Sequence, residues 1–306
     1  MTSYRDMLLL DAVDAYLFWK SQQIKSTSAL NYRRMLSHFC IGLQNKKLGE
    51  VYWLDITNYL DMLRQAGYKQ NTLIPIVVTI RNLFTFFNKQ DSAILNPEMI
   101  PIPHKEYNLP RVLDGDLYKE LIEGIPRNND ARHVRNLAII KLLYDTGARS
   151  GEVASLDLVD VSYRKAVIRT EKNRGTRPFR EIYWSEDTQQ ALDRWLLKKA
   201  SLKERDFKKY SGPELFCSVT GGKSGERLTI KGIGEMLRKY AERLDLPIVI
   251  NPHSFRHKVG RDIIKNGGSA VDVMNILGHA TLASSTIYTQ MYGLEAEERY
   301  RTVLKR

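Results

Sequence analysis

Apolar residues recur at helical spacing through the first hundred residues of the chain. Between positions 29 and 43 they fall three or four residues apart, at Ala29, Tyr32, Leu36, Phe39 and Leu43, as on one face of an amphipathic helix. Asp55 can cap a helix that stops at Gly67, and Asn71 can cap the next one, because short polar side chains accept a hydrogen bond from a helix N-terminus. We expect four short helices that form a small bundle.

Residues 96–112 interrupt this pattern. They include four prolines mixed with charged residues: Pro97, Pro101, Pro103 and Pro110. Proline fixes φ and removes a backbone donor, so this composition predicts an extended linker. The sequence therefore predicts a helical domain at 1–95, the linker, a second domain at 113–292 and a C-terminal tail at 293–306.

The second domain alternates between helical and strand patterns. Helices are expected from Leu113 to about residue 122, over 131–146 with Gly147 at the end, and over 186–200 and 229–244. Residues 166–170 and 179–184 read as two short strands joined by a basic turn, and 214–218 as a possible third. Asn251 can cap a last helix with Pro252 at its first position, where proline is tolerated. The expected fold class is mainly α, with one small antiparallel sheet in the second domain.

The charge of the chain favours a polyanionic partner. The net charge is +12, with +4 carried up to residue 105 and +8 after it, so both halves are basic. A solvated basic surface is the alternative interpretation. Cys40 and Cys217 are isolated in the sequence, which excludes a disulfide framework and favours the cytoplasm. The longest apolar stretch, near residues 72–80, is too short to span a bilayer, so no membrane partner is expected.

Side chains suited to phosphate chemistry gather near the C-terminus. The chain reads N-P-H-S-F-R-H at 251–257 and L-G-H at 277–279, with Tyr288 nine residues further on. His253 and Arg256 are one helical turn apart and project from the same face. Imidazoles can move protons, a guanidinium can neutralise phosphate oxygens and a phenol can attack.

A second cation lies far upstream, in T-G-A-R-S-G-E at 146–152. Arg149 offers a planar fork for two phosphate oxygens, and Glu152, three residues on, can orient it. An ordinary surface Arg–Glu pair is the alternative for such a spacing. With two arginines available, the combined pattern predicts phosphoryl transfer onto a tyrosine without metal or other cofactor.

The order of these residues resembles a known family. Arg149, Lys172, His253 with Arg256, His279 and Tyr288 match the pattern of the tyrosine site-specific recombinases of the lambda-integrase family, and the chain looks closest to the short, two-domain Xer-like type. The resemblance implies an N-terminal core-binding domain of the four-helix, SAM-like kind and a C-terminal catalytic domain. It assigns Tyr288 as the nucleophile and Lys172 as the general acid toward the leaving 5′ oxygen.

Several alternatives remain open beside this assignment. Arg174 and Arg177 compete with Lys172, and Tyr292 competes with Tyr288. His257 lies four residues after His253, which raises a zinc site, but no third ligand is evident and a structural role fits it better. Candidate DNA contacts, each of which could equally be ordinary surface charge, are Lys69, Gln70, Arg81, Arg174, Arg177 and Lys231.

The resemblance implies a DNA strand transferase. Tyr288 would attack a scissile phosphate and give a 3′-phosphotyrosyl link, and a homotetramer or a set of related protomers would exchange strands of two double-stranded DNA sites through a Holliday junction. The tail at 293–306 would dock on a neighbouring protomer. A type IB topoisomerase, which reseals the same strand, and a non-catalytic DNA-binding protein on the same fold are the alternatives.

Overall fold

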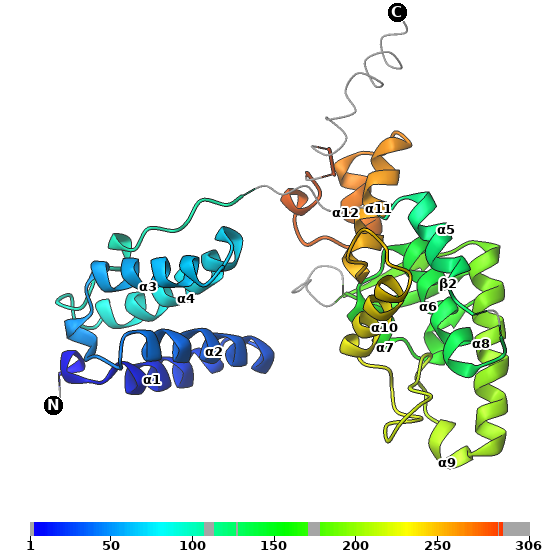
Figure 1. Cartoon of the computed structure of the whole chain (residues 1–306), viewed down its shortest axis with the longest axis horizontal. Helices are drawn as coiled ribbons and strands as arrows, with labels where there is room; N and C mark the ends of the chain where they lie inside the picture. Colours follow the sequence, from blue (N-terminus) through cyan, green and yellow to red (C-terminus); the bar gives the residue numbers. More distant parts are fainter. Residues whose placement is uncertain (1–2, 107–112, 127, 171–177, 287, 290–306) are drawn as a thin grey trace, which may run out of the picture. The chain divides into compact units, whose positions relative to one another are not determined.

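A computed structural model describes residues 3–106, 113–126, 128–170, 178–286 and 288–289 of the chain. The chain forms two compact units, one comprising Met1–Asn108 and the other Leu109–Arg306 (Figure 1). Each unit has its own hydrophobic core. Lys172, Arg174, Arg177, Tyr292 and the tail at 293–306 lie outside the described residues.

The described residues of the first unit form a bundle of four helices. They are α1 (Leu9–Ser21), α2 (Ser26–Gly42), α3 (Trp53–Gln65) and α4 (Gln70–Asn88), with short 3-10 turns at Tyr4–Asp6, Leu48–Glu50 and Pro97–Met99. Helix α2 buries Leu36 and Phe39, as its spacing predicts, and α4 buries an apolar face that includes Phe84 and Phe87. The aromatic rings of Phe39 and Phe84 meet edge to face across the bundle.

Two caps in this unit differ from the sequence prediction. Asp55 is the third residue of α3 and not its cap, and its carboxylate accepts a hydrogen bond from the Tyr52 backbone at 2.9 Å. A carboxylate in the first turn can satisfy the donor that precedes the helix, so the acid shifts inward. Asn71 is the second residue of α4, and its side chain bonds both the backbone N–H (3.0 Å) and the carbonyl (2.8 Å) of Glu106.

The segment after α4 packs on the same unit. Ile94 and Ile100 are buried in its core, on either side of the Pro97–Met99 turn. Together with the contact between Asn71 and Glu106, this packing attaches the described part of residues 96–106 to the first unit.

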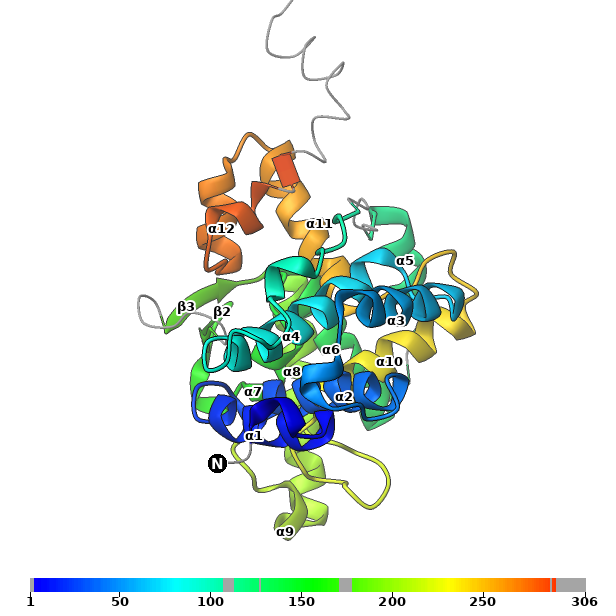
Figure 2. The same cartoon turned by 90° about the vertical axis from the view of Figure 1, so that its left-hand side faces the viewer.

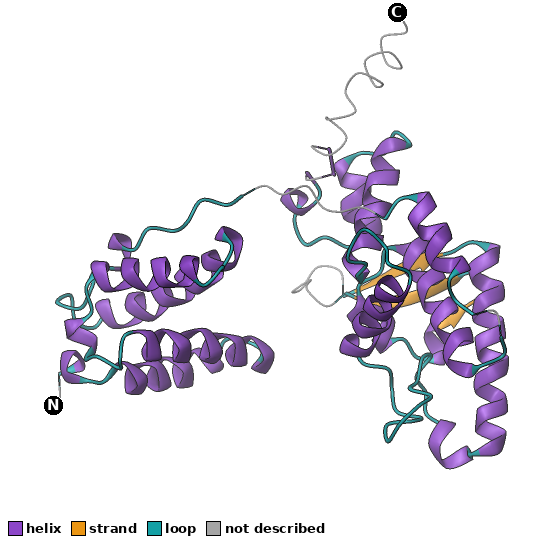
Figure 3. Cartoon of the chain, viewed as in Figure 1, coloured by secondary structure: helices purple, strands orange, loops and turns teal. Residues whose placement is uncertain are grey.

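The second unit is mostly helical, and all described strands belong to it (Figure 3). Its helices are α5 (Gly115–Glu123), α6 (Ala131–Thr146), α7 (Ser150–Ser155), α8 (Glu186–Arg205), α9 (Phe207–Tyr210), α10 (Ile230–Arg243), α11 (Pro252–Lys265) and α12 (Ala270–Leu277), with 3-10 turns at Leu158–Asp160 and Leu282–Ser284. The strands are β1 (Val161–Ser162), β2 (Lys165–Arg169) and β3 (Phe179–Tyr183). The sheet is antiparallel in the order β1-β2-β3, which confirms the predicted fold class.

The possible third strand at 214–218 is wrong. Glu214 forms a single bridge with Asp157, while Cys217 forms another with Arg227. Because the two ends of this stretch pair with different segments, no continuous ladder develops. The third strand of the sheet is β1, which precedes β2 through a tight turn at Arg164.

Two left-handed glycines end the helices that lead to the site. Gly147 follows α6 with φ 58°, and Gly278 follows α12 with φ 68°, a backbone region in which glycine has no steric penalty. Helix α11 begins with Pro252 behind the Asn251 cap, as predicted. Helices α11 and α12 lie side by side (Figure 2) and share a small apolar cluster separate from the main core of the unit.

Candidate active site

Arg149 is fixed at the start of α7, two residues after Gly147 turns the chain. The Glu152 carboxylate accepts hydrogen bonds from the Arg149 backbone N–H and from its Nη1, both at 2.8 Å. Glu152 is fully buried, and the Arg149 side chain is 15% exposed. Nη2 of Arg149 donates to the Gly278 carbonyl at 3.2 Å. The buried Glu152 carboxylate and the Gly278 carbonyl therefore fix the orientation of the Arg149 guanidinium.

Arg256 reaches the same place from α11. Its Nη1 donates to the Gly147 carbonyl at 3.0 Å and its Nη2 to the Leu277 carbonyl at 2.6 Å. The residue is 4% exposed, and among the described residues no carboxylate lies within ion-pair distance of it. Burial, with repulsion from Arg149, lowers the pKa of Arg256 from the usual arginine value to about 9. A buried cation held only by neutral carbonyls is a site for an anion.

A third arginine completes this group. Arg180, on β3, donates from Nη2 to Glu152 at 3.0 Å and from Nη1 to the Ile276 carbonyl at 2.5 Å. Three consecutive carbonyls at the C-terminal end of α12, those of Ile276, Leu277 and Gly278, thus each receive one arginine. The last carbonyls of a helix have no partner within it and carry partial negative charge, so they suit cations.

Tyr288 lies beside this group as a core residue. It is 2% exposed and packs in the apolar cluster of α11 and α12. Its hydroxyl lies 3.1 Å from His257 Nδ1, and the His279 ring stacks on its ring with centroids 6.0 Å apart. His279 is held in turn by Ser285, whose hydroxyl lies 2.7 Å from its Nδ1.

Gly260 makes room for the tyrosine ring. A Cβ at this position would lie 2.6 to 2.8 Å from three carbons of the Tyr288 ring, closer than real contacts allow. The ring therefore rests directly on the backbone of α11. A single missing methyl group fixes how near the phenol approaches His257 and Arg256.

The electrostatics of the site favour neutral histidines and a protonated phenol. Burial lowers the pKa of His257 to about 4, with help from His253 and Arg256. Burial and the nearby Arg256 lower that of His279 to about 4 as well. Burial raises the pKa of Tyr288, and Arg256 and Arg149 oppose that rise. A neutral imidazole at hydrogen-bond distance can accept the phenolic proton when the hydroxyl attacks.

The remaining sequence candidates lie around this centre or apart from it. His253 is exposed on the first turn of α11, one turn before Arg256, and its backbone N–H donates to Asn251. Lys69 and Gln70 stand at the start of α4, with Arg81 three turns later on the same helix. Lys231 is exposed and pairs with Glu235 at 3.6 Å.

Two residues of the site escape the sequence analysis. His257, interpreted there as structural, is the partner of the Tyr288 hydroxyl. Arg180 was not singled out, although its strand offers a signal: alternate residues of β3 face inward, which places Arg180 on the same side as the buried Ile182. A charge on the inner face of a strand needs a buried partner, and here that partner is Glu152.

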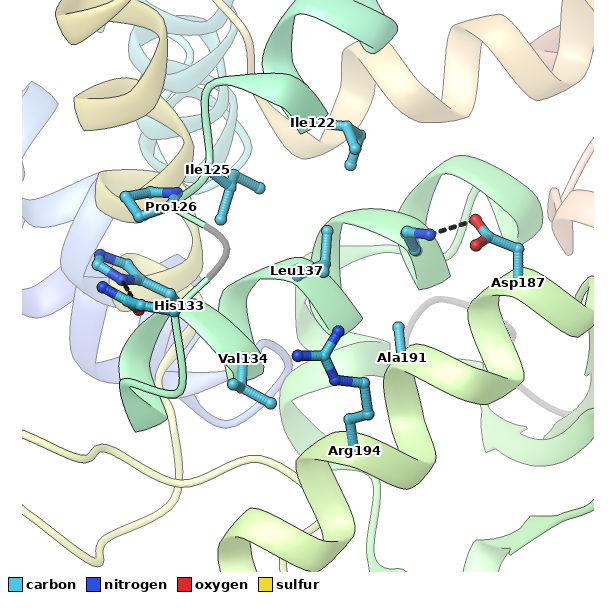
Figure 4. Close-up of a pocket in the computed structure, with 11 residues that line it drawn as sticks. Ile122, Ile125, Pro126, His133, Val134, Leu137, Asp187, Ala191 and Arg194 are labelled. Atoms are coloured by element: carbon cyan, nitrogen blue, oxygen red, sulfur yellow. Dashed lines mark hydrogen bonds and ion pairs between the residues drawn. The ribbon is translucent and has the colours of Figure 1, made fainter.

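A cavity of the second unit lies apart from this site. It has a volume of about 270 Å³ between α5, α6 and α8, and it shares no residue with the tyrosine site. Figure 4 shows Leu137 and Val134 from α6 facing Ala191 and Arg194 from α8 across it. Of its polar groups, Lys141 pairs with Asp187 and His133 with Asn128, and its described lining includes no serine, threonine, tyrosine or cysteine.

Two further searches cover the described residues. Nowhere in that part of the chain do three or more His, Cys, Asp or Glu side chains come together in a way that could hold a metal ion. Its helices include none long and apolar enough to cross a bilayer.

The geometry of the site agrees with a family assignment. The model of the phage integrase family matches residues 111–294, which is more than half of the chain. The chain belongs to this family, and it is a tyrosine recombinase of the Xer-like type.

One named relative and two solved structures are similar to this chain over most of its length. The tyrosine recombinase XerC of Listeria monocytogenes serotype 4a is 27% identical over 265 residues, 86% of this chain and 84% of the relative. The Tn1549 transposon integrase, solved in complex with transposon right end DNA, is similar with a TM-score of 0.77 and 16% identity, over 98% of this chain and 100% of the other. The XerH recombinase bound to its palindromic difH substrate gives a TM-score of 0.75 and 18% identity, over 96% and 95%. The two structures show the fold alone.

Proposed function

We propose that this protein cleaves and rejoins DNA at specific sites with Tyr288 as its nucleophile. One observation carries the proposal: the Tyr288 hydroxyl lies 3.1 Å from His257 and its ring stacks on His279, while the charge of the buried Arg256, which has no carboxylate partner among the described residues, favours the ionised phenol. A phosphodiester seated on Arg149 and Arg256 would be bound by two forked cations. The net charge of +12 fits a polyanionic substrate.

The proposed reaction forms one bond to phosphorus and breaks another. The Tyr288 oxygen bonds the phosphorus, its proton passes to a neutral imidazole, and the bond to the 5′ oxygen breaks. His257 is the nearest acceptor for the proton, and His253 would bond a phosphate oxygen. Lys172 would protonate the leaving 5′ oxygen. The phosphodiester becomes a 3′-phosphotyrosyl link, so its energy is kept and the reverse attack by a 5′ hydroxyl rejoins a strand.

Strand exchange would require several copies of the chain. We propose a homotetramer, or a tetramer of related protomers, on two double-stranded DNA sites, working through a Holliday junction. The first unit, with Lys69, Gln70 and Arg81 on α4, would bind DNA beside the cleavage point, and Arg174, Arg177 and Lys231 would add contacts from the second. The tail at 293–306 would dock on a neighbour. Cys40 and Cys217 are both free and buried, which suits the cytoplasm.

Trapping of a covalent adduct tests the nucleophile. A duplex nicked next to the scissile phosphate loses its 5′ hydroxyl fragment after cleavage, so the protein remains attached to DNA. Tyr288→Phe keeps the ring packing and should abolish the adduct while duplex binding changes little. Tyr292→Phe is the matched control. An adduct that persists in Tyr288→Phe and disappears in Tyr292→Phe would overturn the assignment.

A second assay separates the recombinase from its alternatives. Two labelled duplexes that carry the site, one long and one short, should yield joined products of intermediate length. A type IB topoisomerase would form the adduct and reseal only the original strand. A DNA-binding protein without catalysis would bind both duplexes and form no adduct.

A further inference from the structure

Arg149, Arg180 and Arg256 form the arginine cluster of the site, and Arg180 is the member that extends from the sheet. Its side chain is 9% exposed. It bridges Glu152 and the Ile276 carbonyl, and within the described part of the chain its buried Nε has no hydrogen-bond partner. The residue also passes close under the turn after α12, because a Cβ on Gly278 would lie 2.9 Å from its Cδ and Nε. Arg180 is therefore built into the site through Glu152 and the end of α12.

We propose that Arg180 is a positioning residue that offsets the charge of Glu152 and thereby leaves the charge of Arg149 available to the scissile phosphate. This inference rests on the proposed function. Glu152 is shared, since one carboxylate oxygen binds Arg149 and the other binds Arg180. Without Arg180, the carboxylate would have Arg149 as its only cationic partner among the described residues.

The charges of the cluster show why a third arginine is needed. Arg149, Arg180 and Arg256 supply three positive charges against one negative charge on Glu152. Attack of the phenol on a phosphodiester, with the phenolic proton passed to the imidazole, gives a five-coordinate phosphorus group with two negative charges. With Arg180 present, the three arginines and Glu152 have a net charge of two positive units, which matches the two negative charges. Without Arg180, the net charge is one unit too small. Preorganised charges act on the transition state because they need no rearrangement.

Arg180 also orders the carbonyls that hold the other two arginines. It binds the Ile276 carbonyl, and the next two carbonyls along the chain bind Arg256 and Arg149. Arg180 on β3 pairs with Ile168 on the central strand β2, so the sheet holds Arg180 in position. The sheet thus fixes the end of α12, and the end of α12 fixes the two cations proposed to hold phosphate.

A charge-compensation cycle tests the proposal. Single-turnover cleavage of the nicked duplex is measured at saturating protein for the wild-type chain, Arg180→Met, Glu152→Gln and the double variant Glu152→Gln/Arg180→Met. Arg180→Met should slow cleavage at least tenfold with unchanged duplex binding. The double variant carries no excess negative charge and should cleave at least tenfold faster than Arg180→Met. Glutamine at the third position of α7 can still accept the backbone N–H of the cap, so the helix start is kept.

Matched variants separate charge from packing. Arg180→Lys keeps the charge and should cleave faster than Arg180→Met. Arg238→Met removes an exposed arginine that pairs with Glu242 at 2.6 Å, and it should leave the cleavage rate within twofold. Should Arg180→Met not show a cooperative melting transition, Arg180→Gln takes its place in the cycle because it retains a donor for the Ile276 carbonyl.

The result that overturns the inference differs from the one that overturns the proposed function. If the wild-type chain forms no adduct with any duplex, the proposed function fails. If it does form one, the inference fails in two cases: Arg180→Met cleaves at the wild-type rate, or the double variant is no faster than Arg180→Met. The second case would assign Arg180 to packing alone.

Discussion

Replacement of Arg256 with methionine should separate stability from activity. The cation is buried among neutral carbonyls, and its pKa falls to about 9, well below the usual value of an arginine. A difference of about 3.5 pH units, at roughly 1.4 kcal/mol each, corresponds to a penalty of about 5 kcal/mol for keeping the charge in the empty site. Because the folded-state pKa is depressed, this penalty is fully present below pH 9, which includes neutral pH.

Methionine removes that penalty and also two hydrogen bonds. The carbonyls of Gly147 and Leu277 lose their donors, at a cost of about 1–2 kcal/mol each. The free energy of unfolding of Arg256→Met should therefore equal that of the wild-type chain or exceed it by up to about 3 kcal/mol. Cleavage should fall by about 100-fold or more, because one preorganised donor to the reacting phosphate is lost.

Urea unfolding with and without inorganic phosphate provides the measurement. Trp184 and Trp195 are buried in the second unit and report on its unfolding by fluorescence, while Trp19 and Trp53 are much more exposed. Phosphate at ten times its dissociation constant should stabilise the wild-type second unit by about 1.4 kcal/mol, and Arg256→Met much less. The reasoning would be refuted if the free energy of unfolding of Arg256→Met fell by more than about 3 kcal/mol and rose with phosphate as much as that of the wild type. Arg256 would then not carry an uncompensated charge that binds phosphate.

Three further outcomes are expected. Gly260→Ala should destabilise the second unit by about 1–3 kcal/mol and slow cleavage at least tenfold in the adduct assay, because the new methyl group displaces the Tyr288 ring. Gly234→Ala is the control: nothing lies within 4 Å of its new methyl group, so it should stabilise α10 slightly. His257 and His279 have folded-state pKa values of about 4 against 6.5 unfolded, so their contribution to the free energy of unfolding should be complete above pH 6.5. It should fall toward pH 4 by up to roughly 3 kcal/mol per histidine. Urea midpoints measured against pH should show this fall, and His257→Gln should make it smaller. Asn71→Ala breaks two hydrogen bonds to the segment that follows the first unit, so trypsin should cut after Lys105 several-fold faster on gels, and an unchanged rate would mean that this contact does not hold the segment.

Local signals in the sequence predict the backbone of the site well. Gly147 ends α6 where its position indicates, and Asn251 with Pro252 starts α11 where capping chemistry predicts. These features depend on a few neighbouring residues, so a linear pattern contains them. Glu214 shows the limit of such reasoning: its stretch looks like a strand, but the two ends pair with different segments of the folded chain.

The side-chain partners of the site could not be predicted in the same way. His253 and His257 both lie on α11, and spacing alone does not say which of them meets Tyr288, because that depends on where α12 and the following turn pack. Arg180 is 31 residues from Arg149 in sequence and 96 from Ile276. In the fold it nevertheless binds Glu152, the acid that orients Arg149, and the carbonyl of Ile276. Such contacts arise from the tertiary fold, and no periodicity records them.

The three carbonyls at the end of α12 bear on how this protein can diverge. Main-chain oxygens hold Arg149, Arg180 and Arg256, and every amino acid supplies the same oxygen. The exposed side chain of Ile276 is therefore free to vary, whereas Leu277 is buried in the apolar cluster and can change only to a side chain that fills the same space. Glycine is required at position 278, where the left-handed turn and the close approach of Arg180 exclude a side chain. Insertion or deletion of one residue in α12 would shift all three oxygens at once, so we expect substitutions to accumulate in this helix more readily than changes of length.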